Sequence, residues 1–493
     1  MEYYIGIDLG TSSVKLMLVD GFGNIKKIVM REYPVFYPNS GWSEQYPQDW
    51  WEAVSSAIPE LVEDGEGKSI RGIGVAGQMH GLVILDDRDN IIRPAILWND
   101  GRTALQTEYL NNCIGKEKLF EHTGNIAFAG FTAPKLLWLK ENEPENFAKV
   151  SKIMLPKDYV NYRLTGIHST DFSDASGTLL LDVKNRKWSS EMLKLCSVRE
   201  TQMPCLYESY EVVGRILPET ADKFGISRDV VVVAGAGDNA AAAVGTGTVG
   251  EGRCNISLGT SGTIFASSDH FTGDVTKAIH SFCHADGGYH LMGCILSAAL
   301  CSKWFCEGVL NTRDYGLIEA EIDEELLGRN EVFFLPYLMG ERSPINDTDA
   351  TGLFIGLRPN TTSPQMYLDV LEGVAFAIKD NLDVIEELCV LVSNSSLCGG
   401  GARSSLWRRI LANVLGIELS IPNTEEGPGY GSAMLAMVGS GKFESAKKCA
   451  KELVNIKETI QPDTKLTSLY AERYEKFKYI YPSVKELYKQ IKK

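Results

Sequence analysis

A thirteen-residue pattern occurs twice in this chain, and it constrains the fold more than any other feature. The first copy, residues 5–17, reads I-G-I-D-L-G-T-S-S-V-K-L-M, and the second, residues 254–266, reads C-N-I-S-L-G-T-S-G-T-I-F-A. Each copy predicts a strand, a turn of glycine and hydroxyl residues, and a second strand. Ser257 aligns with Asp8, an offset of 249 residues (257 − 8). The repeat predicts two α/β domains of one fold, built by duplication.

A chain of 493 residues is too long for a single hydrophobic core, which agrees with two repeated units. We place the junction after Gly247, so that residues 1–247 form an N-terminal domain and residues 248–445 a C-terminal domain. Residues 446–493 are rich in lysine and tyrosine and predict an amphipathic helical tail. The cleft between two such domains is a favoured place for a small-molecule site.

The composition argues against several classes of protein. The net charge of −15, without a long Lys/Arg block, argues against a nucleic-acid surface. No uninterrupted apolar run reaches the roughly 18 residues of a membrane span. The eleven cysteines are scattered without a C-x-x-C pair, as is typical of proteins in the reducing cytoplasm. His280, Cys283, His284 and His290 lie close together, but a strand and turn with ordinary histidines explains them better than a metal site.

The strongest chemical signal lies in residues 230–247, which read V-V-V-V-A-G-A-G-D-N-A-A-A-A-V-G-T-G. The four valines predict a buried strand, and Gly235 and Gly237 permit a tight turn and a close approach to the backbone. Asp238 follows at the start of a run of small residues. Burial of an unpaired carboxylate in such a setting costs free energy, which indicates a functional role for this side chain. The alternative role is a helix cap, because Asp before an alanine-rich helix caps well.

The glycine and hydroxyl turns predict an anion site. Turns of this kind present successive backbone N–H groups, so the turns at Gly10 and Gly259 could together hold the β- and γ-phosphates of a nucleotide. Asp8 would then bind Mg²⁺ directly or through water, because hard cations prefer carboxylate oxygen. The glycines of residues 399–401 would let a base and ribose lie against the backbone. Asp238 could accept the proton of an alcohol that attacks the γ-phosphoryl group.

Sequence motifs of other common nucleotide and hydrolytic sites are missing. The chain has no Walker A sequence and no H-R-D or D-F-G set, so neither common ATP-binding template applies. It also lacks G-x-S-x-G and H-E-x-x-H, which argues against the best known hydrolase sites.

Several segments together resemble the FGGY family of carbohydrate kinases, over residues 1 to about 445. They read I-G-I-D-L-G-T-S-S, G-W-S-E-Q-Y-P-Q-D-W-W, G-Q-M-H-G-L-V, L-W-N-D-G-R-T, G-F-T-A-P-K-L-L-W-L-K-E-N, K-D-Y-V-N-Y-R-L-T-G, G-A-G-D-N-A-A-A-A-V-G-T-G and S-L-G-T-S-G. The resemblance implies two ribonuclease-H-like domains of the actin and Hsp70 type that close over a sugar and ATP. It further implies Mg²⁺-dependent phosphorylation of a ketose, with D-xylulose the first expectation, and a homodimer.

The resemblance also implies roles for individual residues. Asp238 would be the general base and a further candidate metal ligand, and Asp8 the essential acid at the phosphates and Mg²⁺. The residues implied at the sugar are Met79, His80, Gln78, Asn239 and Trp98, with a core position as the alternative for His80 and Trp98. The residues implied at the nucleotide and its phosphates are Gly10, Thr11, Gly259, Thr260, Ser261, Gly400, Gly401 and Ala402.

Three places depart from the family pattern. Gly101 stands where glutamine is frequent, which predicts an altered contact on the sugar side. Asp369 occupies a position that usually holds a small residue. Gly429-Tyr430 stands where small apolar residues are usual, and this second departure predicts an altered fit near the nucleotide.

Other functions remain open at this point. The nearest alternative function is a kinase of another ketose or polyol, such as ribulose, gluconate or glycerol. Glycerol is the weakest of these candidate substrates, because glycerol kinases resemble each other in an Arg-Glu pair where this chain has Met79-His80. A non-catalytic, ATP-driven protein of the actin and Hsp70 type is compatible with the fold. A catalytically silent sugar sensor is a third class. The pair of Asp8 and Asp238 argues against the last two.

Overall fold

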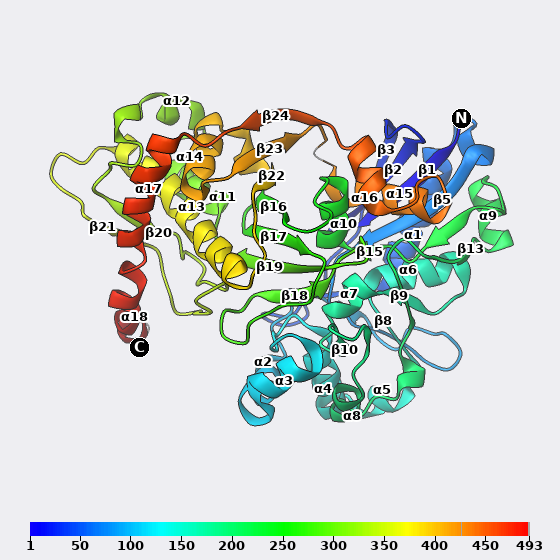
Figure 1. Ribbon diagram of the computed structural model, residues 1–493. Helices are drawn as coiled ribbons and strands as arrows, with labels where there is room; N and C mark the ends of the chain where they lie inside the picture. The colour runs from blue at the N-terminus through cyan, green and yellow to red at the C-terminus, as the bar shows by residue number, and fades with distance from the viewer. Residues whose placement is uncertain (425, 492–493) are drawn as a thin grey trace.

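The computed structural model describes residues 1–424 and 426–491, and in it the chain forms two lobes around two seven-stranded sheets (Figure 1). The first sheet has the order β13-β14-β5-β1-β2-β3, and β15 pairs with the end of β5. Its strands are β1 (Tyr3–Leu9), β2 (Ser13–Asp20), β3 (Ile25–Glu32), β5 (Ile70–Gly77), β13 (Val212–Arg215), β14 (Val231–Val233) and β15 (Ala236–Gly237). The first copy of the repeated pattern is confirmed as the antiparallel pair β1–β2.

The second sheet has the order β18-β19-β17-β16-β22-β23-β24. Its strands are β16 (Arg253–Leu258), β17 (Gly262–Ser268), β18 (His280–Cys283), β19 (Tyr289–Ile295), β22 (Asn394–Cys398), β23 (Glu418–Pro422) and β24 (Ile456–Ile460). The hairpin β16–β17 is the second copy of the repeated pattern. Ser257 pairs with Thr263 in this hairpin as Asp8 pairs with Lys15 in the first.

Both sheets have the same topology around the repeated hairpin. The central strand, β1 or β16, is antiparallel to the strand that follows it and parallel to β5 or β22 on its other side. A second parallel strand comes next, β14 or β23, and an antiparallel strand, β13 or β24, closes that side of the sheet. The shared topology confirms the α/β fold of two similar units that the repeat predicts.

Side chains alternate along β1 between two layers of helices. Ile5, Ile7 and Leu9 pack in one core with α1 (Pro47–Leu61), α6 (Pro156–Thr165) and α9 (Pro218–Phe224). Tyr4 packs on the opposite face, in a core with α10 (Asp238–Gly245), α15 (Gly427–Gly439) and α16 (Ala446–Leu453). Glycine at position 6 permits the close approach of α15, because a Cβ atom there would lie 2.0 Å from the carbonyl oxygen of Gly429.

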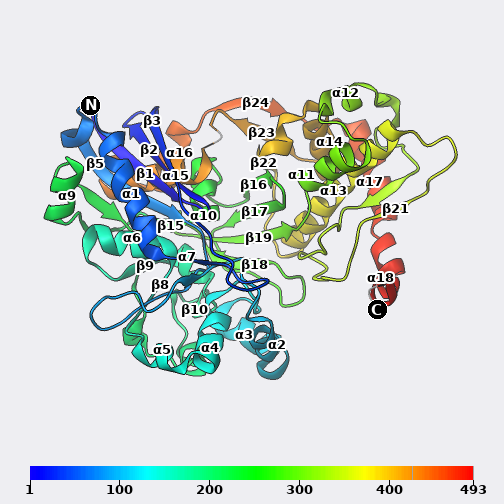
Figure 2. The same cartoon turned by 180° about the vertical axis from the view of Figure 1, so that it is seen from behind.

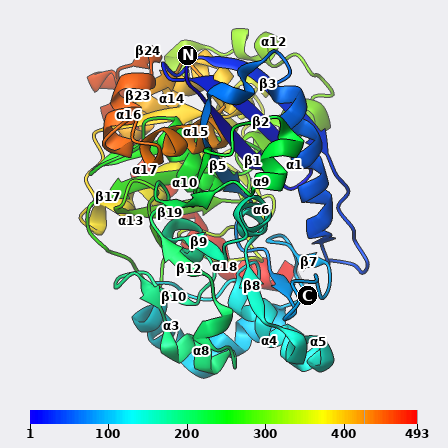
Figure 3. The same ribbon diagram turned by 90° about the vertical axis from the view of Figure 1, so that its right-hand side faces the viewer.

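Helices α15 and α16 follow the second sheet in the sequence but pack on the first one. Both lie in orange against the blue strands of the first lobe in Figures 1 and 2, and the side view of Figure 3 agrees. Tyr430 is buried in this layer, where its hydroxyl donates a hydrogen bond to the carbonyl of Gly23 (3.0 Å). In space, the first lobe therefore includes residues that the sequence division places in 248–445, and Tyr430 contributes to the packing of that lobe.

Helices α13 (Ser363–Glu387) and α14 (Ser405–Leu415) pack on the second sheet, and α17 (Thr464–Phe477) packs on α14 in the same core. Asp369 lies on α13 and forms a buried ion pair with Arg473 of α17 (3.4 Å), which accounts for a charged residue at this position. The prediction of a purely helical tail for residues 446–493 is wrong at β24, which extends the sheet by pairing with β23. Helix α18 (Ile480–Ile491) ends the described chain.

A mostly helical layer lies between β5 and β13 in the sequence, at the foot of the view in Figure 1. Its helices are α2 (Ala104–Glu108), α3 (Lys116–Thr123), α4 (Thr132–Asn142), α5 (Pro144–Lys149), α7 (Phe172–Ser176) and α8 (Ser190–Leu195). Phe282 of β18 packs in the core of this layer, so the second lobe contacts it directly. Among the helices of the described residues, none has both the length and the apolar character needed to cross a bilayer.

Candidate active site

Three predicted site segments meet at one end of the first sheet. Strand β5 lies between β1 and β15, and both Leu9 and Gly237 pair with Gly77 at its end. Asp8 and Asp238 therefore flank the end of β5, from which the chain continues into Gln78, Met79 and His80. The tight turns required here are possible because Gly235 adopts a positive φ of 75° and lies against the backbone of β5.

Asp238 is the first residue of α10, and Gly237 occupies the cap position before it. The Oδ1 atom accepts hydrogen bonds from the backbone N–H (2.7 Å) and the side-chain amide (3.0 Å) of Asn239. Burial and the nearby charge of Asp8 raise the pKa of Asp238 to about 7, although the hydrogen bonds from Asn239 act in the opposite direction. A carboxyl group with this pKa can take up a proton near neutral pH, which is the property required of a general base.

Asp8 is less strongly perturbed than Asp238. Burial raises its pKa to about 6, while the ammonium group of Lys15 lowers it and Glu426 raises it slightly. Lys15 itself forms an ion pair with Glu426 of the segment before α15 (2.7 Å). Two neighbouring carboxyl groups with raised pKa values match the oxygen chemistry that a hard cation requires, because a cation would stabilise both carboxylates. Within residues 1–424 and 426–491, no group of three or more His, Cys, Asp and Glu side chains could hold a metal ion without other ligands.

The segment after β5 is held rigidly. His80 has a positive φ of 68°, and its Nδ1 donates a hydrogen bond to the carbonyl of Gly177 (2.8 Å), because a carbonyl can only accept. The ring stacks on Phe131, with centroids 4.7 Å apart. Burial lowers the pKa of His80 to about 3, so the imidazole is neutral and its Nε2 is a hydrogen-bond acceptor. His80 is thus positioned by packing and still has one polar atom for a ligand.

The other predicted sugar residues take different positions. Met79 is buried under Gly237, and Gln78 is buried with its amide donating to Gln45 (3.0 Å). Asn239 is half-buried beside Asp238. The core alternative for Trp98 is wrong, because this side chain is 46% exposed and its Nε1 donates a hydrogen bond to the Thr11 hydroxyl (3.0 Å).

Gly101, the first departure from the family pattern, is exposed in a turn. Its backbone N–H donates to the carbonyl of Gly41 (2.8 Å), and an added Cβ atom would make only an ordinary contact with that oxygen. A side chain at this position would therefore fit without displacing its neighbours.

A cavity of about 740 Å³ in the second lobe brings two of the predicted nucleotide segments together. Gly259 and Thr260 line it from the β16–β17 turn, and Gly400 and Gly401 line it from the triple-glycine loop. An added Cβ atom on Gly400 would meet nothing within 4 Å, so a flat ligand can approach this backbone. Gly10 and Thr11 belong to the other lobe, and Ser261 and Ala402 are not among the lining residues.

Several residues of this cavity have no recognisable signal in the sequence. Three aromatic side chains and two cationic ones line it in addition to the glycines, namely Tyr315, Tyr367, Trp407, Lys303 and Arg403. They come from α12 (Tyr315–Ala320), α13, α14, α11 (Ala299–Lys303) and the loop before α14. Aromatic walls with nearby positive charge suit a nucleotide, whose base stacks and whose phosphates are anionic.

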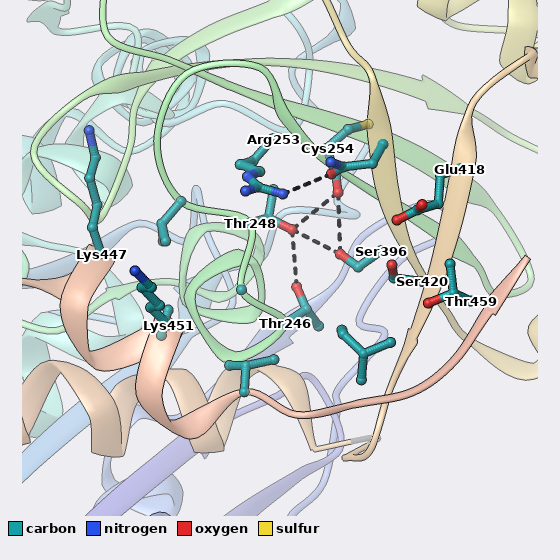
Figure 4. Close-up of a pocket in the computed structure, with 16 residues that line it drawn as sticks. Thr246, Thr248, Arg253, Cys254, Ser396, Glu418, Ser420, Lys447, Lys451 and Thr459 are labelled. Carbon is teal, nitrogen blue, oxygen red and sulfur yellow. Dashed lines mark hydrogen bonds between the residues drawn. The ribbon is translucent and has the colours of Figure 1, made fainter. Parts of the chain in front are cut away.

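A second cavity, of about 550 Å³, lies where the chain passes between the lobes (Figure 4). Its walls come from the end of α10, from α16 and from the starts of β16, β22 and β23. The hydroxyl of Thr248 lies 2.9 Å from that of Ser396 of β22, so a polar contact holds the connecting segment against the second sheet. None of the predicted site residues lines this cavity.

The histidines near residue 280 belong to an aromatic cluster between the lobes. His280 stacks on Phe282 with centroids 5.2 Å apart, and His290 stacks on Phe265 at 4.0 Å. They lie on the antiparallel strands β18 and β19, as the strand-and-turn interpretation predicts. Burial lowers the pKa of both imidazoles well below the ordinary range.

Comparison with known proteins agrees with this geometry over nearly the whole chain. Residues 3–245 match the N-terminal domain, and residues 254–440 the C-terminal domain, of the FGGY family of carbohydrate kinases. A curated xylulose kinase from Escherichia coli (strain K12) is 41% identical over 482 residues, which cover 97% of this chain and 98% of that protein.

Solved structures of sugar kinases are also similar to this chain over nearly its whole length. The crystal structure of a xyloylose kinase from Brucella ovis has a TM-score of 0.94 at 39% identity, covering 99% of this chain and 100% of that one. The gluconate kinase from Lactobacillus acidophilus has a TM-score of 0.92 at 26% identity, covering 99% of each chain. The family match over both halves and the close relatives show that this chain belongs to the FGGY family of carbohydrate kinases.

Proposed function

We propose that this carbohydrate kinase transfers the γ-phosphoryl group of ATP to the terminal hydroxyl of D-xylulose, giving D-xylulose 5-phosphate, with Asp238 as the general base. The observation that carries the mechanism is the position of Asp238 beside Asp8 at the end of the first sheet, with its pKa raised to about 7. Support for the sugar comes from the relatives, since the xylulose kinase of Escherichia coli matches this chain over 97% of its length.

Asp238 would accept the proton of the sugar hydroxyl as this oxygen attacks phosphorus. The Oδ1 atom is engaged by Asn239, and Oδ2 accepts no hydrogen bond from any described residue, so Oδ2 is the oxygen available to the substrate. The phosphoryl transition state is loose, and the base contributes mainly by positioning the alcohol. The two requirements are therefore a fixed carboxylate and a pKa near the working pH.

Mg²⁺ would be held by Asp8, directly or through water, with Asp238 as a further candidate ligand. Mg²⁺ sites commonly use one or two carboxylates together with water and substrate phosphates, so the pair at the sheet end fits the ion. The ion would neutralise charge on the phosphates. Gly10 and Thr11 of the first lobe and Gly259, Thr260 and Ser261 of the second would present backbone N–H groups to the same phosphates.

The nucleoside would occupy the cavity of the second lobe. Gly400 leaves room for the ribose and base, with Gly401 and Ala402 in the same loop, and the aromatic walls supply stacking surfaces. The sugar would lie on the first lobe, between the neutral Nε2 acceptor of His80, the exposed indole of Trp98 and the amide of Asn239. Met79 and Gln78 are buried and would shape this site from below.

We propose two further properties on the basis of the family resemblance, a dimeric state and a location in the cytoplasm. The protein would act as a homodimer, which light scattering on the purified chain can test. It would function in the cytoplasm, which is compatible with eleven cysteines that occur as free thiols.

The test is coupled ADP release with Mg-ATP over a panel of D-xylulose, L-ribulose, D-ribulose, glycerol, gluconate and water alone. We expect turnover on D-xylulose to exceed all others. The likeness to a gluconate kinase at a TM-score of 0.92 means that the fold is shared by kinases named for different sugars, so gluconate is the most informative competitor. Highest turnover on another sugar would retain the mechanism and overturn the substrate. A rate equal to the water blank on every sugar would overturn the kinase proposal.

A further inference from the structure

Helix α7 contacts both substrate-side segments of the first lobe, and no role for it follows from the proposed mechanism. It has five residues, Phe172–Ser176, and is buried behind Asp238 and His80. We infer that Ser173 is a positioning residue for the general base, and that α7 fixes the position of Asp238 relative to that of His80. This inference rests on the proposed function, because that function makes Asp238 the base.

The first contact of α7 fixes the peptide before the base. The backbone N–H of Gly237 donates a hydrogen bond to the Ser173 hydroxyl (3.1 Å). Gly237 directly precedes Asp238, so this bond holds the backbone from which the carboxylate projects. Strand β15 consists of two residues, Ala236 and Gly237, so the bond to Ser173 adds to the pairing with β5 and the contact with Met79.

The second contact fixes His80. The carbonyl of Gly177, the residue after α7, accepts the hydrogen bond from Nδ1 of His80 (2.8 Å). A Cβ atom on Gly177 would lie 2.4 Å from this nitrogen, so only glycine permits the contact. One short helix therefore holds the base at its N-terminal end and the histidine at its C-terminal end.

The third contact reaches the other lobe. The backbone N–H of Cys283, at the end of β18, donates to the Ser176 hydroxyl (3.0 Å). Strand β18 belongs to the second sheet, so α7 is attached to both lobes. A movement of the second lobe that displaces β18 would therefore act on the helix that holds Asp238 and His80.

Buried charges hold α7 in place. The Oδ2 atom of Asp171 accepts from the backbone N–H (2.8 Å) and the hydroxyl (2.5 Å) of Ser173 and from the hydroxyl of Ser209 (2.7 Å). Its Oδ1 atom lies 2.9 Å from the ammonium group of Lys157, which also contacts Asp158 (2.7 Å). All of these side chains are buried. Removing one charge of the buried ion pair would leave its partner uncompensated, so the pair of Asp171 and Lys157 restrains the position of α7.

The network also fixes the direction of the Ser173 hydroxyl. An ionised carboxylate can only accept, so Ser173 must donate its one proton to Asp171. The remaining lone pairs of the hydroxyl are then available to the N–H of Gly237. Ser209 donates to the same Asp171 oxygen but has no hydrogen bond with Gly237 among those recorded for the described chain. The carbonyl of Ser209 accepts a hydrogen bond from the N–H of Gly235 (2.9 Å), a backbone contact that an alanine at position 209 keeps. The two serines thus share the network and differ in whether their hydroxyl contacts Gly237.

This difference provides a matched pair of variants, Ser173→Ala and Ser209→Ala, in the full-length protein. For Ser173→Ala we expect kcat to fall about 10- to 100-fold, because an error of about 1 Å in position can cost this much. We expect KM for ATP to change less than about twofold, and Ser173→Thr, which keeps the hydroxyl, to recover most of kcat. For Ser209→Ala we expect kcat within about twofold of the wild type.

A second readout does not depend on activity. Hydrogen exchange of a peptide that covers residues 234–245 should be about tenfold faster at the Gly237 amide in Ser173→Ala, because one hydrogen bond is lost. It should be unchanged in Ser209→Ala. If Ser173→Ala does not fold, Ser173→Cys replaces it, since sulfur has a similar size and is a weak acceptor.

The outcomes separate this inference from the proposed function. Equal kcat in the two alanine variants, or equal exchange at residue 237, would overturn the positioning role even if the enzyme phosphorylates D-xylulose. Faster exchange in Ser173→Ala alone supports the role even if no sugar of the panel raises ADP release, in which case the proposed function fails by itself.

Discussion

Asp8 and Asp238 flank the end of the same strand, β5, where burial and the negative charge of Asp8 raise the pKa of Asp238. The two carboxyl groups come from positions 230 residues apart (238 − 8) and are brought together by parallel pairing on either side of one strand. Asp238, the proposed base, therefore takes up a proton near neutral pH when no cation is bound. A bound cation would lower both pKa values, so metal binding and base activation are linked.

Replacing Asp238 by Asn should abolish transfer and leave sugar binding intact. The amide has nearly the same shape but cannot accept a proton, and general-base catalysis contributes about 10²- to 10⁴-fold. We expect kcat of Asp238→Asn to fall by this amount, while calorimetry gives a dissociation constant for D-xylulose within about threefold of the wild type. Turnover at the wild-type rate would show that Asp238 is not the base. Asp87→Asn, at an exposed carboxylate, is the control and should retain full activity.

The raised pKa of Asp238 also predicts how stability depends on pH. The group titrates at about 7 in the folded protein and near 3.8 when unfolded, so the folded state binds the proton more tightly. Its contribution to stability is therefore lost as pH rises between these values. Asp238→Asn removes this loss, and its gain in Tm over the wild type, without metal or nucleotide, should be at least about 2 °C larger at pH 8 than at pH 5. An identical gain at both pH values would contradict the raised pKa.

Trp98 should affect sugar binding more than stability. Its side chain is 46% exposed, and its indole N–H contacts Thr11 in the phosphate turn. In Trp98→Phe we expect KM for the sugar to rise about 3- to 10-fold, from the loss of one hydrogen bond and some contact area, with Tm within about 1 °C. Trp304→Phe is the matched control, because Trp304 is 36% exposed in the second lobe. An equal rise of KM in both variants would remove Trp98 from the sugar site.

Arg473 should be essential for the stability of the second lobe. It contacts the carboxylates of Glu372 (2.8 Å) and Asp369 (3.4 Å), all three side chains being buried. Arg473→Met leaves two buried carboxyl groups without their cation, which costs about 3–5 kcal/mol. We expect a large drop in Tm by calorimetry. Arg358→Met breaks an exposed pair with Glu331 and should cost less than about 1 kcal/mol. Similar Tm values for the two variants would contradict this assignment.

Sugar and nucleotide together should close the two lobes. The proposed sugar contacts lie on the first lobe and the nucleotide cavity lies in the second, so the reacting groups meet only when the lobes approach. We expect small-angle scattering to show a smaller radius of gyration with D-xylulose and a non-hydrolysable ATP analogue than with either ligand alone. No compaction with both ligands would contradict closure, and Asp238→Asn, which retains sugar binding, should compact as the wild type does.

The elements with strong local patterns could be predicted from the sequence. Both copies of the repeated hairpin, and the strand, turn and helix around Asp238, combine β-branched runs with glycine turns, and these signals act over a few residues. Strand β24 could not be predicted in this way. Its residues are nearly all exposed, and it forms because β23 presents an edge to it, so no apolar alternation marks it in the sequence.

Candidate site residues could be chosen from the sequence to a similar degree. Asp8, His80 and Asp238 lie at or just after strand ends with a glycine within two positions, which distinguishes them from ordinary core positions. Trp98 had two equally good interpretations, because an aromatic side chain suits both a core and a ligand site. The contact of Ser173 with Gly237 joins positions 64 residues apart, and the contact of Lys157 with Asp171 follows no known spacing, so neither could be predicted from the sequence.

The matching topology of the two sheets has a consequence for how sugar preference can change in evolution. The position of Asp8 in the first sheet is that of Ser257 in the second, so the two descendants of one ancestral unit differ in charge at the same strand end. Two carboxylates on opposite sides of a triphosphate would repel it, and the serine removes one of them. In the proposed assignment the sugar lies on the first lobe and the nucleotide in the second. We therefore expect substitutions on the sugar side of the first lobe to change sugar preference while the nucleotide cavity stays the same.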